Sequence, residues 1–186
     1  MRTGTLDLTS VGRATLFAVT GGALFAFWFV ARPSTEMTAE MREWPNVLWF
    51  SATLLTLAIA VPVFGRLVGG ATAIRLATIG GAGVALSSVA NVLEDGFRIE
   101  AAFFLFVAGT LTLNLALLAL TIEIARRPGV RARVLAVIPA GALVGILLFV
   151  AVGGPVMLVT WLAAAAAALW PAAEQPPVPE PRVGTP

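Results

Sequence analysis

Long uncharged apolar runs constrain this chain more than any other feature of its sequence. Several exceed the roughly 18 residues that distinguish a membrane-spanning helix from a buried core helix. Apolar residues make up 59% of the chain and charged residues only 12%, against about 25% charged in a soluble domain. In a soluble protein these runs would have no polar face to turn towards water. The sequence therefore predicts an all-α fold, a polytopic membrane helix bundle.

Six membrane-spanning helices are predicted. They cover about residues 14–30, 47–67, 71–93, 101–124, 134–152 and 156–170. Pro139 lies inside the fifth and predicts a kink, while the sixth is short and either crosses a thinned bilayer or stops part-way. A signal peptide is the competing interpretation of the first helix, but its bulky Phe and Trp residues do not suit a small-residue cleavage site. Residues 1–172 then form one transmembrane domain, and the Pro-rich residues 173–186 form a disordered or extended cytoplasmic tail.

The arginines predict the orientation of the bundle. The chain has twelve basic residues and no lysine, so all of them are arginine. With six spans and a cytoplasmic N-terminus, the inner side holds Arg2, Arg13, Arg66, Arg75, Arg126, Arg127, Arg131, Arg133 and Arg182, and the outer side holds Arg32, Arg42 and Arg98. Because cytoplasmic loops retain basic residues, this bias predicts that both termini are cytoplasmic. Arginine without lysine, with abundant Ala, Gly and Val, is typical of a GC-rich bacterial genome, so we expect a multi-pass protein of a bacterial cell membrane.

The predicted outer loop at residues 32–46 contains an amphipathic pattern. Met37, Met41 and Trp44 fall on one helical face, with Glu36, Glu40 and Glu43 on the other. Ser34 or Thr35 would cap this helix and Pro45 would end it. The pattern predicts a helix lying flat in the headgroup region. The alternative is a lid over an outer pocket.

A polar funnel opening outward between the second, third and fourth helices is the candidate ligand-binding site. Its members are the polar side chains in the outer halves of these helices: Thr53, Ser87, Asn91, Glu94, Asp95, Thr110 and Asn114. At 1.5 Å per residue, Ser87 and Thr110 reach about the same depth, and Thr53 lies there as well. Two simpler interpretations stand beside the funnel. The Ser, Thr and Asn side chains form ordinary hydrogen bonds between helices, and Glu94 and Asp95 belong to a solvated turn.

The side-chain inventory excludes many chemistries. The chain has no His and no Cys, which removes Ser-His-Asp hydrolysis and ordinary zinc, haem or iron–sulfur ligation. Without Lys there is no Schiff base, and no phosphate-binding loop or nucleic-acid-binding pattern is present. A metal site drawn from Glu36, Glu40, Glu43, Glu94, Asp95 and Glu100 is an alternative whose spacing matches no calcium loop. We therefore expect no cofactor.

Small residues and one ion pair complete the predictions. Ala77, Gly81 and Ala85, with Gly83 beside them, and Gly141 with Gly145, form faces that let helices approach closely or self-associate. Glu123 is spaced to pair with Arg126 or Arg127.

Three function classes remain open. The first is a non-enzymatic membrane protein that acts through helix packing, partner association or its Arg-rich inner face. The second is a small-molecule binding or transport subunit that uses the outer funnel. The third is an enzyme built around the Glu94 and Asp95 carboxylates. In size, number of helices and topology, the chain resembles the substrate-capturing membrane subunits of energy-coupling-factor vitamin transporters, and this resemblance of architecture implies the second class.

Overall fold

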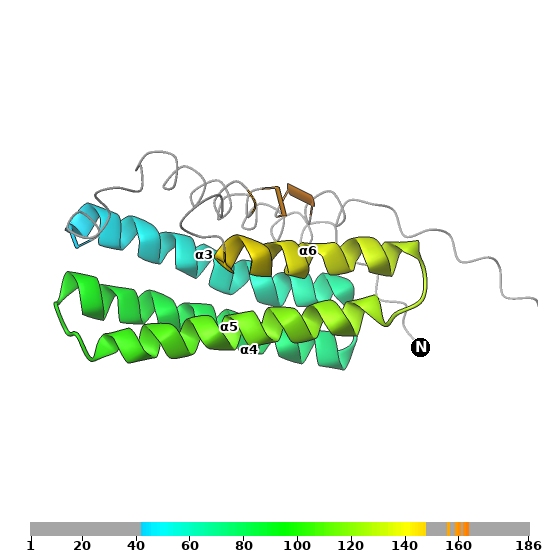
Figure 1. Ribbon diagram of the computed structural model, residues 1–186, viewed down its shortest axis with the longest axis horizontal. Coiled ribbons are helices and arrows are strands. Elements are labelled where there is room, and N and C mark those ends of the chain that lie inside the picture. Colours follow the sequence, from blue (N-terminus) through cyan, green and yellow to red (C-terminus); the bar gives the residue numbers. More distant parts are fainter. Residues whose placement is uncertain (1–41, 148–155, 157–158, 161, 164–186) are drawn as a thin grey trace, which may run out of the picture.

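The described part of the chain is a bundle of apolar helices. The structure, a computed structural model, describes residues 42–147 together with 156, 159–160 and 162–163. Its elements are α3 (Trp44–Val68), α4 (Ala71–Asn91), a short π-helix η1 (Val92–Gly96), α5 (Ala102–Ala125) and α6 (Val130–Leu147) (Figure 1). No strand occurs within these residues, and α3, α4 with η1, and α5 are each long and apolar enough to cross a membrane. The predicted all-α class is confirmed.

Several sequence predictions fall on other parts of the chain. The first predicted span, the tail and most of the sixth span lie outside the described residues. Of the sixth, the five described residues are helical. Six spans and cytoplasmic termini therefore stay predictions, and so does the flat helix with Met37 and Met41.

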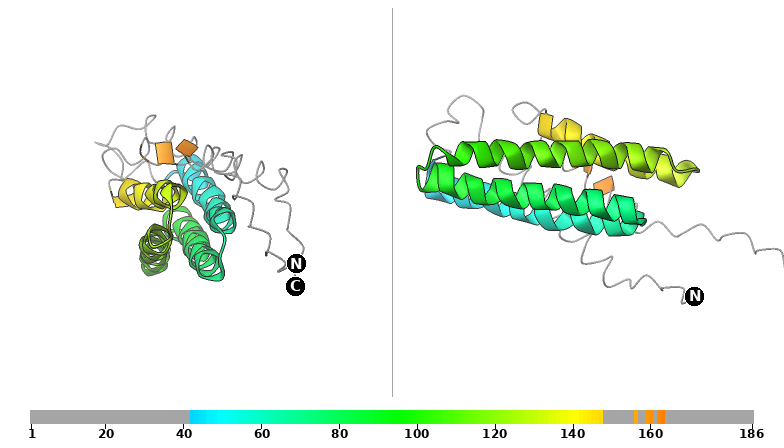
Figure 2. Two further views of the ribbon diagram at one scale, coloured as in Figure 1. Left: turned by 90° about the vertical axis from the view of Figure 1, so that its right-hand side faces the viewer. Right: turned by 90° about the horizontal axis from the view of Figure 1, so that it is seen from below.

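Consecutive helices run antiparallel. Gly69 and Gly70 join α3 to α4, and the segment 126–129 joins α5 to α6, both at one end of the bundle (Figure 1). Gly69, Gly70 and Gly129 have positive φ, which glycine adopts at little cost. Viewed from this end, α4 lies beside both α3 and α5, and α6 lies beside α5 (Figure 2). We call this end the arginine end, because it carries Arg66, Arg75 and Arg126, and the end with η1 the opposite end.

The start of α3 corrects the interpretation of Pro45. The sequence predicted a span from residue 47, with Pro45 ending the preceding loop helix. Instead α3 begins at Trp44, and Pro45 lies in its first turn. Proline suits this position because first-turn N–H groups have no partner within the helix. Trp44 is therefore a residue of α3.

Two further boundaries differ from prediction. The third helix was expected to end near Leu93, but it continues as η1 to Gly96, where the N–H of Phe97 donates to the carbonyl of Val92, 3.1 Å away. The fifth was expected from residue 134, but α6 begins at Val130. Long arginine side chains reach polar surroundings from the end of an apolar helix, so Arg133 does not exclude helix in this first turn.

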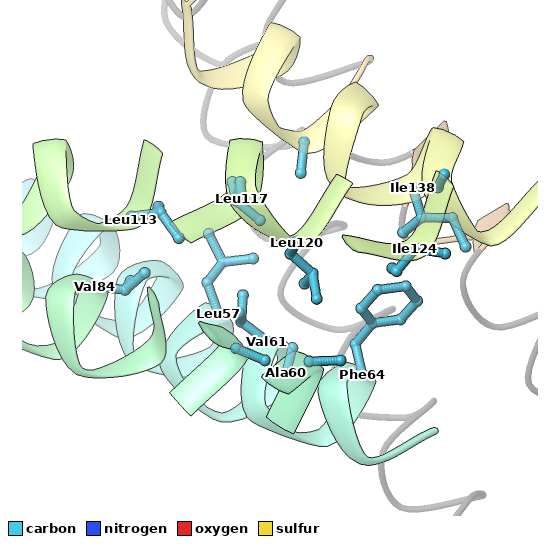
Figure 3. Packing of buried hydrophobic residues seen from close by; sticks show 14 of the residues in the cluster. Leu57, Ala60, Val61, Phe64, Val84, Leu113, Leu117, Leu120, Ile124 and Ile138 are labelled. Carbon is cyan, nitrogen blue, oxygen red and sulfur yellow. The ribbon is translucent and has the colours of Figure 1, made fainter. Parts of the chain in front are cut away.

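The core lies between all four helices. Leu57, Val61 and Phe64 of α3 meet Leu120 and Ile124 of α5, with residues of α4 and α6 completing the cluster (Figure 3). The cluster extends from the arginine end towards η1, where it includes Phe50 and Val84.

Small residues set the spacing of α4 from its neighbours. A Cβ on Gly81 would stand 2.8 Å from the Ala58 carbonyl oxygen of α3, and one on Gly83 would stand 2.6 Å from the Gly109 carbonyl oxygen of α5. Ordinary Cβ atoms do not approach backbone oxygen so closely. The predicted close approach at Gly81 and Gly83 is confirmed.

Candidate functional site

Ser87 and Thr110 join α4 to α5 in the half of the bundle away from the arginine end. Their hydroxyl oxygens lie 3.2 Å apart, and the Ser87 hydroxyl also donates to the Phe106 carbonyl oxygen at 3.2 Å. The contact depends on the close approach of Gly83 and Gly109. The prediction that Ser87 and Thr110 reach the same depth is confirmed, and the two hydroxyls satisfy one another.

A second polar contact joins α3 to α4. The Ser88 hydroxyl donates to the Ser51 carbonyl oxygen at 2.9 Å, and the Ser51 hydroxyl donates to the Ser88 carbonyl oxygen at 3.4 Å. The Asn91 amide donates to the Ser51 hydroxyl at 3.0 Å and to the Val47 carbonyl oxygen at 3.3 Å. Ser51, Ser88 and Asn91 are all buried. Each bond of this kind in a membrane is worth about 0.6 kcal/mol, and together they fix the register of α3 against α4.

Thr53 directs its hydroxyl into its own helix. It is completely buried, and its hydroxyl donates to the Trp49 carbonyl oxygen at 3.0 Å. Such a bond to the residue one turn earlier is a common way to satisfy threonine inside a helix. Thr53 therefore has the predicted depth in α3, while its bond runs along α3 instead of across to Ser87 or Thr110.

Asn114 differs from the other polar residues of the predicted funnel. Its position 12 residues into α5 places it about 18 Å from the start of that helix, near the middle of the span. Its side-chain carbonyl oxygen is buried, and in the described part of the chain it is the single buried side-chain polar atom without a hydrogen-bond partner. An unpaired buried acceptor costs about 1–3 kcal/mol. Asn114 is thus the residue of the predicted funnel whose buried side-chain oxygen can still accept a hydrogen bond.

Glu94 and Asp95 lie in η1, at the opposite end from the arginines. Asp95 forms an ion pair with Arg42, with 3.5 Å between Oδ1 and Nε. The Arg98 guanidinium donates to the Arg42 carbonyl oxygen at 3.3 Å, and Arg98 itself has a left-handed φ of 61°. Both acids are helical residues of η1, and both are half-buried, so they do not belong to a fully solvated turn.

An aromatic contact covers the same end. The rings of Trp44 and Phe97 meet edge to face with centroids 5.3 Å apart. A Cβ on Gly96 would stand 2.9 Å from the Trp44 ring, so glycine gives the indole its place against η1. At this end of the described bundle, aromatic packing therefore lies beside the ion pair between Arg42 and Asp95.

The metal alternative gains no support from the described residues. Among them, no three carboxylates, histidines or cysteines lie close enough together to hold an ion. Glu36 and Glu40 of that alternative lie outside the described part.

Arg127 organises the arginine end. Its guanidinium donates to the carbonyl oxygens of Val68 at 2.9 Å and Gly69 at 2.8 Å, which are left open where α3 ends. The same group lies 3.3 Å from the Glu123 carboxylate one turn earlier in α5. The predicted pairing of Glu123 is confirmed for Arg127. The contacts with α3 were not predicted. Arg127 is separated from Val68 by 59 positions and from Gly69 by 58, and no local sequence pattern relates residues so far apart.

Sequence reasoning also missed Ser51 and Ser88. A signal for Ser88 existed, since it lies three residues before Asn91 and steps of three share a helical face. Ser51 lies four residues after Val47, on the face of α3 that Asn91 meets. The residues of the predicted funnel were grouped by their depth in the membrane. Depth alone does not indicate which neighbouring helix each polar side chain faces.

Comparisons with protein-family models, with curated proteins and with solved structures find no match to this chain. The functional argument therefore depends on the residues and contacts described above.

Proposed function

We propose that this chain is a non-enzymatic integral membrane protein that crosses the cell membrane six times, with both termini in the cytoplasm. It acts through helix packing and through association with other membrane proteins or with further copies of itself. The observation that supports this most directly is the bonding of Ser51, Ser87, Ser88, Asn91 and Thr110, whose polar groups bond to neighbouring helices. Polar groups used in this way hold a bundle together and need no ligand.

The experiment that tests this role compares stability with solute binding. Purified wild-type protein in detergent is heated in the presence of a panel of amino acids, vitamins, sugars and nucleosides. Because a solute that binds the folded state stabilises it by mass action, a binding protein would show a higher melting temperature with at least one solute. We expect none to raise it. A solute that does so, and whose effect disappears in Asn91→Ala, would contradict the packing role.

The proposed orientation has its own test. Single cysteines replacing Ser34 and Thr185 are treated on intact cells with a thiol reagent that does not cross membranes; the chain has no cysteine of its own to interfere. We expect labelling at position 34 and protection at position 185, which follows from the arginine bias. The reverse pattern would contradict the orientation.

A small-molecule binding or transport subunit is the second candidate, and Asn114 favours it. Its buried carbonyl oxygen can accept a hydrogen bond from a ligand near the middle of the membrane. If it does, Asn114→Leu abolishes any stabilisation by the active solute, whereas Thr112→Val, which removes a hydroxyl bonded within α5, leaves it unchanged.

A further inference from the structure

The arginine end carries one exposed arginine on each of the four described helices or directly after it. Arg66 lies in the last turn of α3, Arg75 in the second turn of α4, Arg126 directly after α5 and Arg133 in the first turn of α6. All four are exposed. At 1.5 Å per residue, each lies within about 6 Å of its helix end, so the four gather at the arginine end, and we call this set the arginine level.

Each of these arginines continues an exposed apolar column on its own helix. The columns are Leu55, Ile59 and Arg66; Arg75, Ile79 and Leu86; Leu115, Ile122 and Arg126; and Arg133, Val137 and Val144. Every column uses steps of four and seven residues, which keep side chains on one helical face. The apolar members are 38–67% exposed. The same arrangement thus occurs four times, with an exposed apolar face ending in a guanidinium.

Within the described residues, acidic partners for these arginines are scarce at this end. Residues 66–75 and 123–133 include six arginines, and the single acid among them is Glu123. Glu123 is engaged by Arg127. In the described part of the chain, Arg66, Arg75, Arg126 and Arg133 form no ion pair. The arginine level therefore has a large positive charge that the described residues do not neutralise.

We propose that these four arginines bind the headgroups of anionic phospholipids in the adjoining leaflet, whose acyl chains lie along the apolar columns. A guanidinium matches phosphate oxygens in geometry and charge, and its long side chain carries the charge from the helix surface to headgroup level. A soluble acidic protein would match the arginines but leave the columns without an apolar partner. An anionic phospholipid offers negative charge and apolar chains in the order that the columns present, and it does so on all four helices at once.

The test uses the full chain, purified in detergent and stripped of lipid. Phosphatidylglycerol and phosphatidylcholine are titrated separately, and bound lipid is counted by native mass spectrometry. A basic residue near an anionic surface contributes about 1 kcal/mol, or roughly fivefold in affinity. We expect the wild type to prefer phosphatidylglycerol by at least that factor. The combined variant R66Q/R75Q/R126Q/R133Q should bind the two lipids equally, while R42Q/R98Q, changed at the opposite end, should keep the preference.

Several results would overturn the proposal. Equal binding of the two lipids by the wild type would do so, as would an undiminished preference in the four-arginine variant. Displacement of phosphatidylglycerol by millimolar inorganic phosphate would indicate a site for free anions instead. If the combined variant does not fold, judged by circular dichroism, Arg66→Gln and Arg133→Gln are measured singly, and a preference unchanged in both contradicts the proposal.

This inference rests on the membrane location proposed above. The two fail differently. A chain that stays dispersed without detergent would end both, whereas a chain that needs detergent but shows no headgroup preference would end the lipid inference alone.

Discussion

The two halves of the described bundle share an apolar core and differ in the polar contacts that are added to it. Towards η1, directional hydrogen bonds join α3 to α4 at Ser51, Ser88 and Asn91, and α4 to α5 at Ser87 and Thr110. Towards the arginine end, apolar side chains of all four helices pack together, and Arg127 closes the end of α3. In lipid, close packing supplies most of the association between helices, and each hydrogen bond adds little. The comparison teaches that hydrogen bonds add register to the half towards η1, while apolar packing, which runs from Phe50 and Val84 to Phe64 and Ile124, supplies stability to both halves.

The largest expected effect is in the half towards the arginine end. A Cβ on Gly65 would overlap the Ala77 side chain and stand 3.1 Å from the Ala73 carbonyl oxygen. Gly65→Val should therefore force α3 and α4 apart and cost about 3 kcal/mol, measured by denaturation in mixed detergent. Ala52→Val, an exposed site on the same helix, is the control and should change little. Equal losses from the two variants would contradict the close packing of α3 against α4 at Gly65.

Arg127→Gln should have the next largest effect. It leaves the Val68 and Gly69 carbonyl oxygens without the guanidinium donor, and an unpaired group that is partly shielded from water costs about 1–2 kcal/mol. Arg126→Gln is the matched control, because it removes the same charge from an exposed neighbouring position and should stay within about 0.5 kcal/mol. Urea unfolding of both variants makes the comparison. If the two lose the same stability, charge alone and not the capping of α3 matters.

A smaller loss is expected in the hydrogen-bonded half. Asn91→Ala removes the donors to Val47 and Ser51, so it should cost about 1 kcal/mol. Thr78→Ala removes an exposed hydroxyl that bonds within its own helix and should cost nearly nothing. A loss above about 3 kcal/mol for Asn91→Ala would show that these hydrogen bonds supply stability as well as register.

The smallest effect should be a gain. Replacing Asn114 by leucine keeps the number and branching of side-chain heavy atoms and removes the unpaired buried oxygen, so Asn114→Leu should stabilise the bundle by up to about 1 kcal/mol. Thermal unfolding in detergent measures it. A clear loss of stability would indicate that Asn114 has a bonding partner in the purified protein.

The sequence predicted those features that depend on distance along a helix. The depth of Ser87 and Thr110, the close approach at Gly83 and the pair of Glu123 with Arg127 all follow from a fixed rise or a fixed turn. The partners of Asn91 did not, because they depend on how α3 is rotated about its axis. The rotation of a helix about its axis is set by packing along its whole length. In an apolar helix with nearly uniform hydropathy, the sequence does not indicate which face is buried.

Helix ends were predicted less well for a related reason. Trp44 and Pro45 begin α3 although proline was expected to end a helix, and Val92–Gly96 continues α4 as a π-helix. Both outcomes depend on which backbone groups already have partners. The local sequence determines only in part which backbone groups have partners. Tertiary contacts, such as the packing of Trp44 on Gly96, also determine where these helices begin and end.

The capping of α3 by Arg127 has a consequence for the order in which the protein is made. The guanidinium that satisfies the Val68 carbonyl is synthesised 59 residues after it. When the hairpin of α3 and α4 first leaves the ribosome, its turn is therefore incomplete, and water or lipid headgroups must serve those carbonyls. The arrival of α5 ends that exposure. The turn between α3 and α4 therefore gains its final hydrogen bonds only after α5 has been made.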